Sequence, residues 1–168
     1  MNLIYTILNV AGYISTVIVI VTSLLAVAAW FKGILPAVLR LGNGLAKRKI
    51  ALFAKPKDSE SLKTLLTDSG IFNERNIICI TKSMDFGKAE KATLFLVYWP
   101  DWKTEIDDIL QKKDDGTALV VYAPPDLGRV LDGDAKKING HRNSILTNFR
   151  GRLLNDIVAS MITTSYKR

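Results

Sequence analysis

The sequence has 168 residues, of which 48% are hydrophobic and 23% are charged, and its formal net charge is +7. This length suits one domain with an appendage, and the apolar content excludes disordered and collagen-like proteins. A single cysteine, Cys79, and a single histidine, His141, exclude an internal disulfide and leave no ligand set for structural zinc. We therefore expect no metal site.

The N-terminal segment is uncharged as far as Phe31, and the first charged side chain is Lys32. At a rise of about 1.5 Å per residue, this apolar run exceeds the roughly 20 residues needed to cross a bilayer. We expect residues 1–31 to form one transmembrane helix with Trp30 at the membrane boundary. A cleaved signal peptide fits less well, because such peptides begin with basic residues and carry an apolar run of roughly 7 to 15 residues.

The surplus positive charge lies in residues 32–57, which contain basic side chains and no acidic one. Residues 32–48 are therefore expected to form a basic juxtamembrane segment that binds anionic lipid head groups. The positive-inside rule then places the N-terminus outside and the rest of the chain in the cytoplasm, as a single-pass protein of the inner membrane. The expected interface residues are Trp30, Lys32, Arg40, Lys47, Arg48 and Lys49.

Because this segment accounts for the net charge, we expect no nucleic-acid partner. Within the span, Ala11 and Ser15 place small residues four apart, which permits self-association of the helix. Residues 33–46 (GILPAVLRLGNGLA) are predicted to be a short interfacial helix or a continuation of the span, with Gly42, Asn43 and Gly44 as a stop signal. This stretch is too short to cross the bilayer again.

From residue 49 onward, short β-branched runs alternate with amphipathic helical segments, as in the parallel sheet of an α/β domain. The predicted strands are residues 50–54, 76–81, 93–98, 117–123 and 144–149. The third and fourth are apolar almost throughout, which is typical of strands covered on both faces.

Four helices are expected between and after these strands. The first is capped by Asp58 or Ser59 and ended by Gly70, and a short second helix spans 88–92. A third helix ends at Gly116, and its buried stripe comprises Trp102, Ile106, Ile109 and Leu110. The closing helix covers 151–166, and the glycine-rich residues 128–141 are predicted to be a loop.

Five strands with intervening helices over residues 49–168 resemble the layout of flavodoxin-like and receiver-like domains, and TIR-like domains are similar. The resemblance implies a five-stranded, mainly parallel flavodoxin-like sandwich. A membrane anchor joined to such a domain is similar to the layout of small bacterial signalling and antiviral defence proteins, which implies an effector role. A phosphoaccepting receiver needs clustered carboxylates after its first strand, whereas this chain has Lys55-Pro56-Lys57 there. We therefore do not expect aspartyl phosphorylation.

Ligands of open parallel sheets bind outside the carboxyl ends of the strands. The candidate ligand-binding residues just beyond those ends are Lys55, Lys82, Ser83, Asp101 and Arg150. Three are cationic, and Arg150 begins the closing helix, where backbone N–H groups favour an anion. They are expected to converge on an anionic, nucleotide-like ligand; alternatively, they are solvated edge residues.

The sequence contains neither a phosphate-binding loop of the P-loop type nor a dinucleotide fingerprint, so we expect no cofactor. Cys79 lies within a strand and His141 has no supporting motif, so no catalytic residue is assigned. These features favour a non-enzymatic, membrane-anchored cytoplasmic module that binds a partner protein or an anionic ligand. The alternative is a nucleotide-processing hydrolase or transferase of TIR-like type, for which Glu90 and Glu105 are the nearest acids.

Overall fold

The computed structural model describes residues 2–164, apart from the side chains of residues 2, 4, 37–41, 43, 44 and 46. The chain divides into two units, Met1–Leu41 and Gly42–Arg168. We call the second one the α/β unit.

The N-terminal region is one continuous helix, α1 (Asn2–Ala46), which contains Pro36. Its hydroxyl groups donate to backbone carbonyls one turn earlier, for example from Ser15 to Ala11 at 2.9 Å and from Thr22 to Ile18 at 2.8 Å. The stretch 33–46 thus continues the first helix. The predicted stop at residues 42–44 was wrong, because the helix passes through both glycines and ends at Ala46.

The core of the α/β unit is a five-stranded, all-parallel sheet, which confirms the predicted fold class. Its strands are β1 (Ile50–Phe53), β2 (Ile77–Ile80), β3 (Leu94–Tyr98), β4 (Ala118–Tyr122) and β5 (Ser144–Thr147). The spatial order is β2-β1-β3-β4-β5, the order of flavodoxin-like sheets. All residues of β1, β3 and β4 are buried, as expected for strands covered on both faces.

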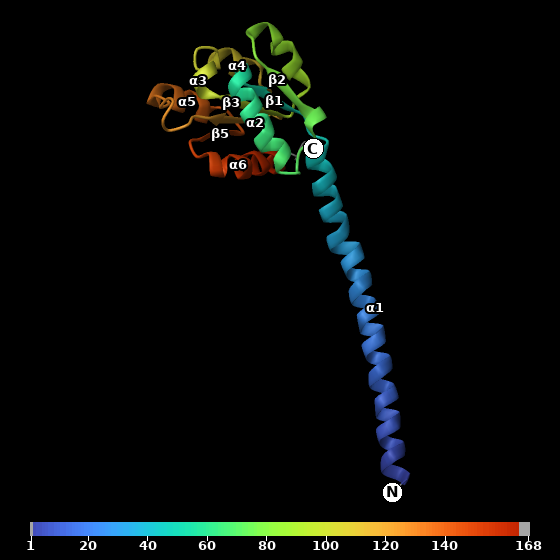
Figure 1. The fold of residues 1–168 in the computed structure, drawn as a ribbon. Coiled ribbons are helices and arrows are strands. Elements are labelled where there is room, and N and C mark those ends of the chain that lie inside the picture. Colours follow the sequence, from blue (N-terminus) through green and yellow to red (C-terminus); the bar gives the residue numbers. More distant parts are fainter. Residues whose placement is uncertain (1, 165–168) are drawn as a thin grey trace. The chain divides into compact units, whose positions relative to one another are not determined.

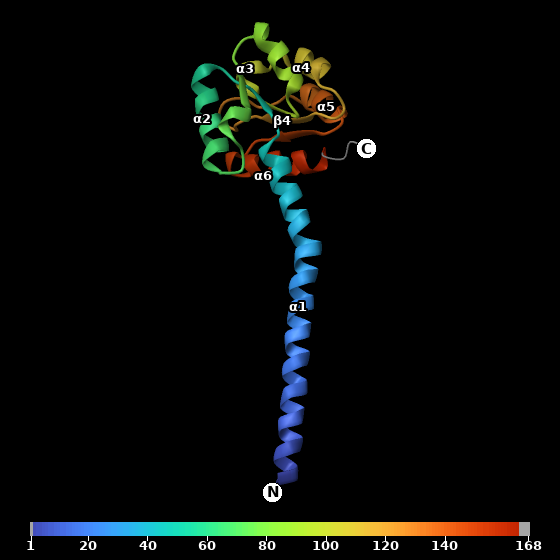
Figure 2. The ribbon, with the colours of Figure 1, turned by 90° about the vertical axis from the view of Figure 1, so that its right-hand side faces the viewer.

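Helices cover both faces of the sheet (Figure 1, Figure 2). One face carries α2 (Pro56–Asp68) and α6 (Arg150–Thr163). The other carries η2 (Ser83–Lys91), α3 (Trp99–Trp102), α4 (Ile106–Lys112) and α5 (Asp132–Gly140). A short 3-10 helix, η1 (Glu74–Asn76), precedes β2.

Alternation along the strands divides the core into two clusters. The cluster under α2 and α6 is largely aliphatic and includes Leu52, Leu96 and Val120, with Leu45 packed against it. The cluster under η2, α4 and α5 is rich in aromatic residues, and Phe53 makes edge contacts with Phe95 and Trp102 at centroid distances of 5.3 and 5.7 Å.

Three local predictions need correction. Helix α2 starts at Pro56 with Lys55 as its N-cap, because proline is preorganised for the first helical position. The third helix is split into α3 and α4, although its predicted stripe from Trp102 to Leu110 is buried. The predicted loop 128–141 contains α5, whose acidic first turn complements the helix dipole and whose Ile138 is fully buried.

Candidate functional site at the carboxyl edge of the sheet

The strand order reverses direction between β1 and β3, so the loops that follow these strands leave the sheet toward opposite faces. Such a switch point is where open α/β sheets bind ligands. Here the loop after β1 leads into α2, and the loop after β3 leads into α3. The candidate site is therefore built on the first residues beyond β1 and β3.

The structure brings Lys55 and Asp101 together at this switch point. The backbone N–H of Lys55 donates to Oδ2 of Asp101 at 2.7 Å. Because Lys55 is the N-cap of α2, the carboxylate of Asp101 lies where the helix dipole favours negative charge. A carboxylate of the protein itself thus occupies the position at this helix end that would suit an external anion.

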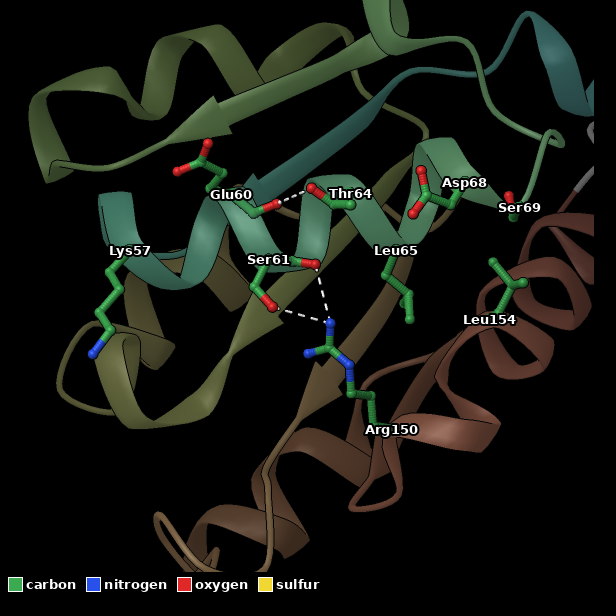
Figure 3. A pocket seen from close by; sticks show the side chains of 9 residues that line it. All are labelled: Lys57, Glu60, Ser61, Thr64, Leu65, Asp68, Ser69, Arg150 and Leu154. Atoms are coloured by element: carbon green, nitrogen blue, oxygen red, sulfur yellow. Dashed lines mark hydrogen bonds between the residues drawn. The ribbon is translucent and has the colours of Figure 1, made fainter.

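Arg150, the first residue of α6, reaches across to α2 (Figure 3). Its Nη2 donates to both the carbonyl oxygen and Oγ of Ser61, at 3.1 and 3.0 Å. The ion pair with Asp156 is made instead by Arg152, through a long N–O distance of 3.9 Å within α6. Arg150 is therefore an exposed side chain that connects two helices.

Lys82 and Ser83 lie elsewhere. They follow β2, whereas Arg150 follows β5, and these are the two opposite edge strands. With four strand spacings of about 4.8 Å between the strands, their ends are about 19 Å apart. The structure thus does not bring Lys82 and Arg150 together, and the expected convergence of Lys55, Lys82 and Arg150 on one ligand is not seen.

Two adjoining hollows surround Arg150 and Ser61. One is an open groove of about 670 Å³ between α2 and α6, in which Leu65 and Leu154 line the wall (Figure 3). The other is a smaller depression of about 220 Å³ at the sheet edge, lined among others by Asp58, Tyr98 and Tyr122. Ser61 and Arg150 contribute to both.

Tyr98 and Tyr122 were not predicted as site residues. They are the last residues of β3 and β4, they pair in register, and their ring centroids are 6.0 Å apart. Burial raises the pKa of Tyr98, and the negative charges of Asp58 and Asp101 raise it further, whereas Arg150 opposes this effect. The Tyr98 hydroxyl therefore stays protonated and can donate a hydrogen bond. The one feature of the sequence that could have indicated them is that each of these two strands ends in a tyrosine.

A third hollow, of about 330 Å³, lies beside the ends of β4 and β5. Pro125, Arg129 and Asn148 contribute to its lining. Gly128 also lines it and has a φ of +154°, which accounts for a glycine at this turn. The glycine-rich segment thus combines a turn at the sheet edge with helix α5.

The predicted membrane-interface residues differ in their surroundings. Trp30, Lys32, Lys47 and Lys49 are exposed, and the side chain of Arg40 lies outside the described part. Arg48 is half-buried, its Nη1 donates to Oγ1 of Thr164 at 3.1 Å, and burial lowers its pKa. The guanidinium of Arg48 is thus a contact within the α/β unit.

Groups with catalytic chemistry are sparse near this edge. Cys79 is half-buried in β2, and Glu90 and Glu105 belong to η2 and to the N-cap of α4. Within residues 2–164, no three His, Cys, Asp or Glu side chains are grouped so that they could hold a metal ion. The hollows at the carboxyl edge instead offer tyrosine hydroxyls, guanidinium groups and aspartate carboxylates.

The comparisons with known proteins found no match, so the chain is classified by its fold. A scan against models of protein families found no match for the chain. Searches of curated proteins and of solved structures found no significant match either. The chain is thus defined by an apolar N-terminal helix followed by an α/β unit with flavodoxin-like strand order.

Proposed function

We propose that the chain is a membrane-anchored binding module of the inner membrane. In this proposal α1 crosses the bilayer once, and the α/β unit lies in the cytoplasm, where it binds a partner or a small ligand at the carboxyl edge of its sheet. The observation that carries the proposal is a helix of uncharged residues as far as Phe31, followed by an acid-free basic segment.

Length and exposure support the anchor. The apolar part of α1, Tyr5–Pro36, has 32 residues and none of its side chains is buried. At about 1.5 Å per residue it measures about 48 Å, which exceeds the roughly 30 Å hydrocarbon core of a bilayer. Leaving such a surface in water would be unfavourable, because each fully exposed large aliphatic side chain forgoes roughly 1.5–3 kcal/mol.

The charge distribution supports the orientation. Residues 1–31 contain no Lys or Arg, whereas Lys32, Lys47 and Lys49 follow this uncharged stretch and are exposed. Basic residues that flank a span are retained on the cytoplasmic side, so the α/β unit is expected there. The same exposed lysines suit contacts with anionic lipid head groups.

The groups at the carboxyl edge support binding as its role. Asp101 is engaged by the backbone of Lys55, and Arg150 is held by Ser61, so both side chains have defined positions. Two buried tyrosines complete a small depression beside them. Defined polar groups around a small hollow are what recognition of a ligand requires.

The experiment is a topology measurement on the full chain. Reporters that are active only in the cytoplasm or only outside it are fused to the C-terminus, and membranes are extracted with carbonate. We expect activity of the cytoplasmic reporter and retention in the membrane. Activity of the outside reporter would refute the orientation, and release by carbonate would refute the anchor.

A charge variant sharpens this test. Replacing Lys32, Arg40, Lys47 and Lys49 by glutamine should produce molecules of mixed orientation, because most of the positive charge close to the span is removed. The matched control replaces four exposed lysines of the α/β unit, Lys88, Lys91, Lys103 and Lys112, and should keep the native orientation. Equal effects of both sets would contradict the proposed role of the basic segment.

A further inference from the structure

Two opposite charges line the depression at the sheet edge without pairing with each other. Asp58 comes from the first turn of α2, and Arg150 comes from the first turn of α6. Within the described residues, the carboxylate of Asp58 makes no hydrogen bond or ion pair. Arg150 donates from Nη2 to Ser61, which leaves Nη1 and Nε as further donors.

The hydrogen bonds from Arg150 to Ser61 explain why Arg150 does not pair with Asp58. They fix the guanidinium against the second turn of α2, while Asp58 lies in the first turn of the same helix. An acid and a base that line one small hollow in this way can both bind groups of one ligand. Such a ligand must carry a negative group for Arg150 and a positive group for Asp58.

The remaining walls favour an ammonium group with a short apolar substituent. Tyr98 and Tyr122 are each 5% exposed, and both rings border the depression. Aromatic faces attract cations, and a tyrosine hydroxyl can hydrogen-bond to a polar ligand. Leu62, Pro124 and Leu127 supply an apolar lining. Its volume of about 220 Å³ suits a molecule of the size of a free amino acid.

We propose that this depression binds a small zwitterion, a free α-amino acid with an aliphatic side chain. Its carboxylate pairs with Arg150, its ammonium group pairs with Asp58 beside the tyrosine rings, and its side chain packs on Leu62 and Leu127. This inference rests on the proposed binding role of the sheet edge and names the ligand class for it.

The charges at this edge favour a zwitterion over a nucleotide phosphate. A phosphate group placed on Arg150 would lie in the same hollow as Asp58, and the carboxylate of Asp101 is close enough to affect Tyr98. Like charges at short range repel each other, whereas a zwitterion satisfies both signs. Of the two lysines expected to help bind a phosphate, Lys82 follows the far edge strand, and Lys55 does not line the depression.

The experiment measures binding of L-leucine to the full chain in detergent micelles by saturation-transfer-difference NMR. Two analogues each lack one charge: N-acetyl-L-leucine lacks the ammonium group, and L-leucinamide lacks the carboxylate. Guanosine monophosphate serves as the nucleotide probe. We expect L-leucine to bind with a dissociation constant below about 1 mM, and each analogue to bind at least about tenfold more weakly.

Variants assign this binding to the two charged residues. Asp58→Asn and Arg150→Gln should each weaken binding of L-leucine at least about tenfold. The matched controls are Asp68→Asn and Arg152→Gln, which change the same residue types on α2 and α6 outside the depression and should bind like the native chain. Thermal unfolding of every variant shows whether the α/β unit remains folded.

Each outcome of the binding experiment supports or overturns the proposed amino-acid site. Absence of L-leucine binding at about 10 mM, or equal binding by native chain and by folded Asp58→Asn and Arg150→Gln variants, would overturn the amino-acid site. Binding of guanosine monophosphate alone would overturn the zwitterion while supporting a ligand site at the edge. Failure of all probes leaves the membrane anchor to the separate topology measurement, so the two proposals fail independently.

Discussion

The same aliphatic residues have opposite surroundings in α1 and in the sheet. Ile18 and Val19 of α1 are 56% and 62% exposed, whereas Ile50 of β1 and Val120 of β4 have no exposed surface. The α/β unit covers its core side chains with its own helices, whereas no side chain of the stretch Tyr5–Pro36 in α1 is buried. Under the proposed membrane anchor, the same aliphatic residue types serve two solvents, a protein interior in the sheet and a lipid bilayer around α1.

The largest effect is expected when a charge is placed in each region. Val120→Lys puts an unpaired charge at the centre of the buried sheet and should destabilise the α/β unit by more than about 4 kcal/mol, while the chain remains in the membrane. Val17→Arg with Val21→Arg places two charges in the middle of α1, at a cost of about 5–7 kcal/mol for insertion. This double variant should leave the membrane fraction and keep a folded α/β unit.

Protease resistance and carbonate extraction of the full chain distinguish the two results. Conservative controls, Val17→Leu with Val21→Leu for the helix and Gln111→Lys on the exposed face of α4, should behave like the native chain. If the charges in α1 unfolded the α/β unit, or left the chain in the membrane, the division into two solvents would be wrong.

A medium effect is expected at the start of the α/β unit. Arg48 donates to Thr164, and Leu45 packs on the cluster under α2 and α6. We expect Arg48→Ala to lower the free energy of unfolding by about 1.5 kcal/mol and Leu45→Ala by about 1 kcal/mol, because each removes a contact inside the unit. A chain that begins at residue 42 should therefore be more stable than one that begins at the predicted boundary, residue 49.

Urea unfolding of the full-length variants measures these changes. Lys47→Ala and Lys49→Ala flank Arg48, are exposed, and should change the free energy of unfolding by less than about 0.5 kcal/mol. Similar losses for all three positions would mean that Arg48 acts through charge alone and that its hydrogen bond to Thr164 contributes nothing specific.

The local pattern of apolar residues in the sequence predicted the strands and helices that bury most of their side chains in the core. The strands β3 and β4 are runs of apolar residues in which every side chain is buried, so burial and the sequence signal coincide there. Helix α5 was missed because Ile138 is its only buried side chain and its glycines and charges are typical of loops. The predicted start of α2 was wrong because Pro56 is preorganised for the first helical position, which makes Lys55 the N-cap.

The sequence predicts that two residues of the candidate site lie close together where both follow neighbouring strands. Lys55 and Asp101 follow neighbouring strands, and the structure joins them by a hydrogen bond. Lys82 also follows a strand, but its strand is at the sheet edge, and strand order depends on long-range pairing that a local pattern does not contain. Tyr98 and Tyr122 were missed because a tyrosine that ends a buried strand looks like core in the sequence.

The smallest effect is expected at a surface ion pair of the α/β unit. This pair tests how little surface charges contribute to the stability of the unit compared with the burial of apolar side chains. Lys63 Nζ lies 2.6 Å from Oε1 of Glu74, and the Glu74 side chain is 67% exposed. The hydrogen bond from Lys63 holds the pKa of Glu74 below its ordinary value. The stabilisation from this pair is therefore present above the unfolded-state pKa of Glu74 and is lost as the pH falls through its folded-state pKa.

We expect Glu74→Gln to shift the urea midpoint only slightly at neutral pH, and the shift to shrink at about pH 3 and in high salt. Glu90→Gln, an exposed control on η2, should change the urea midpoint at neutral pH less than Glu74→Gln does. A loss at Glu74 as large as that of Arg48→Ala would mean that surface charge, and not burial, sets the stability of the α/β unit.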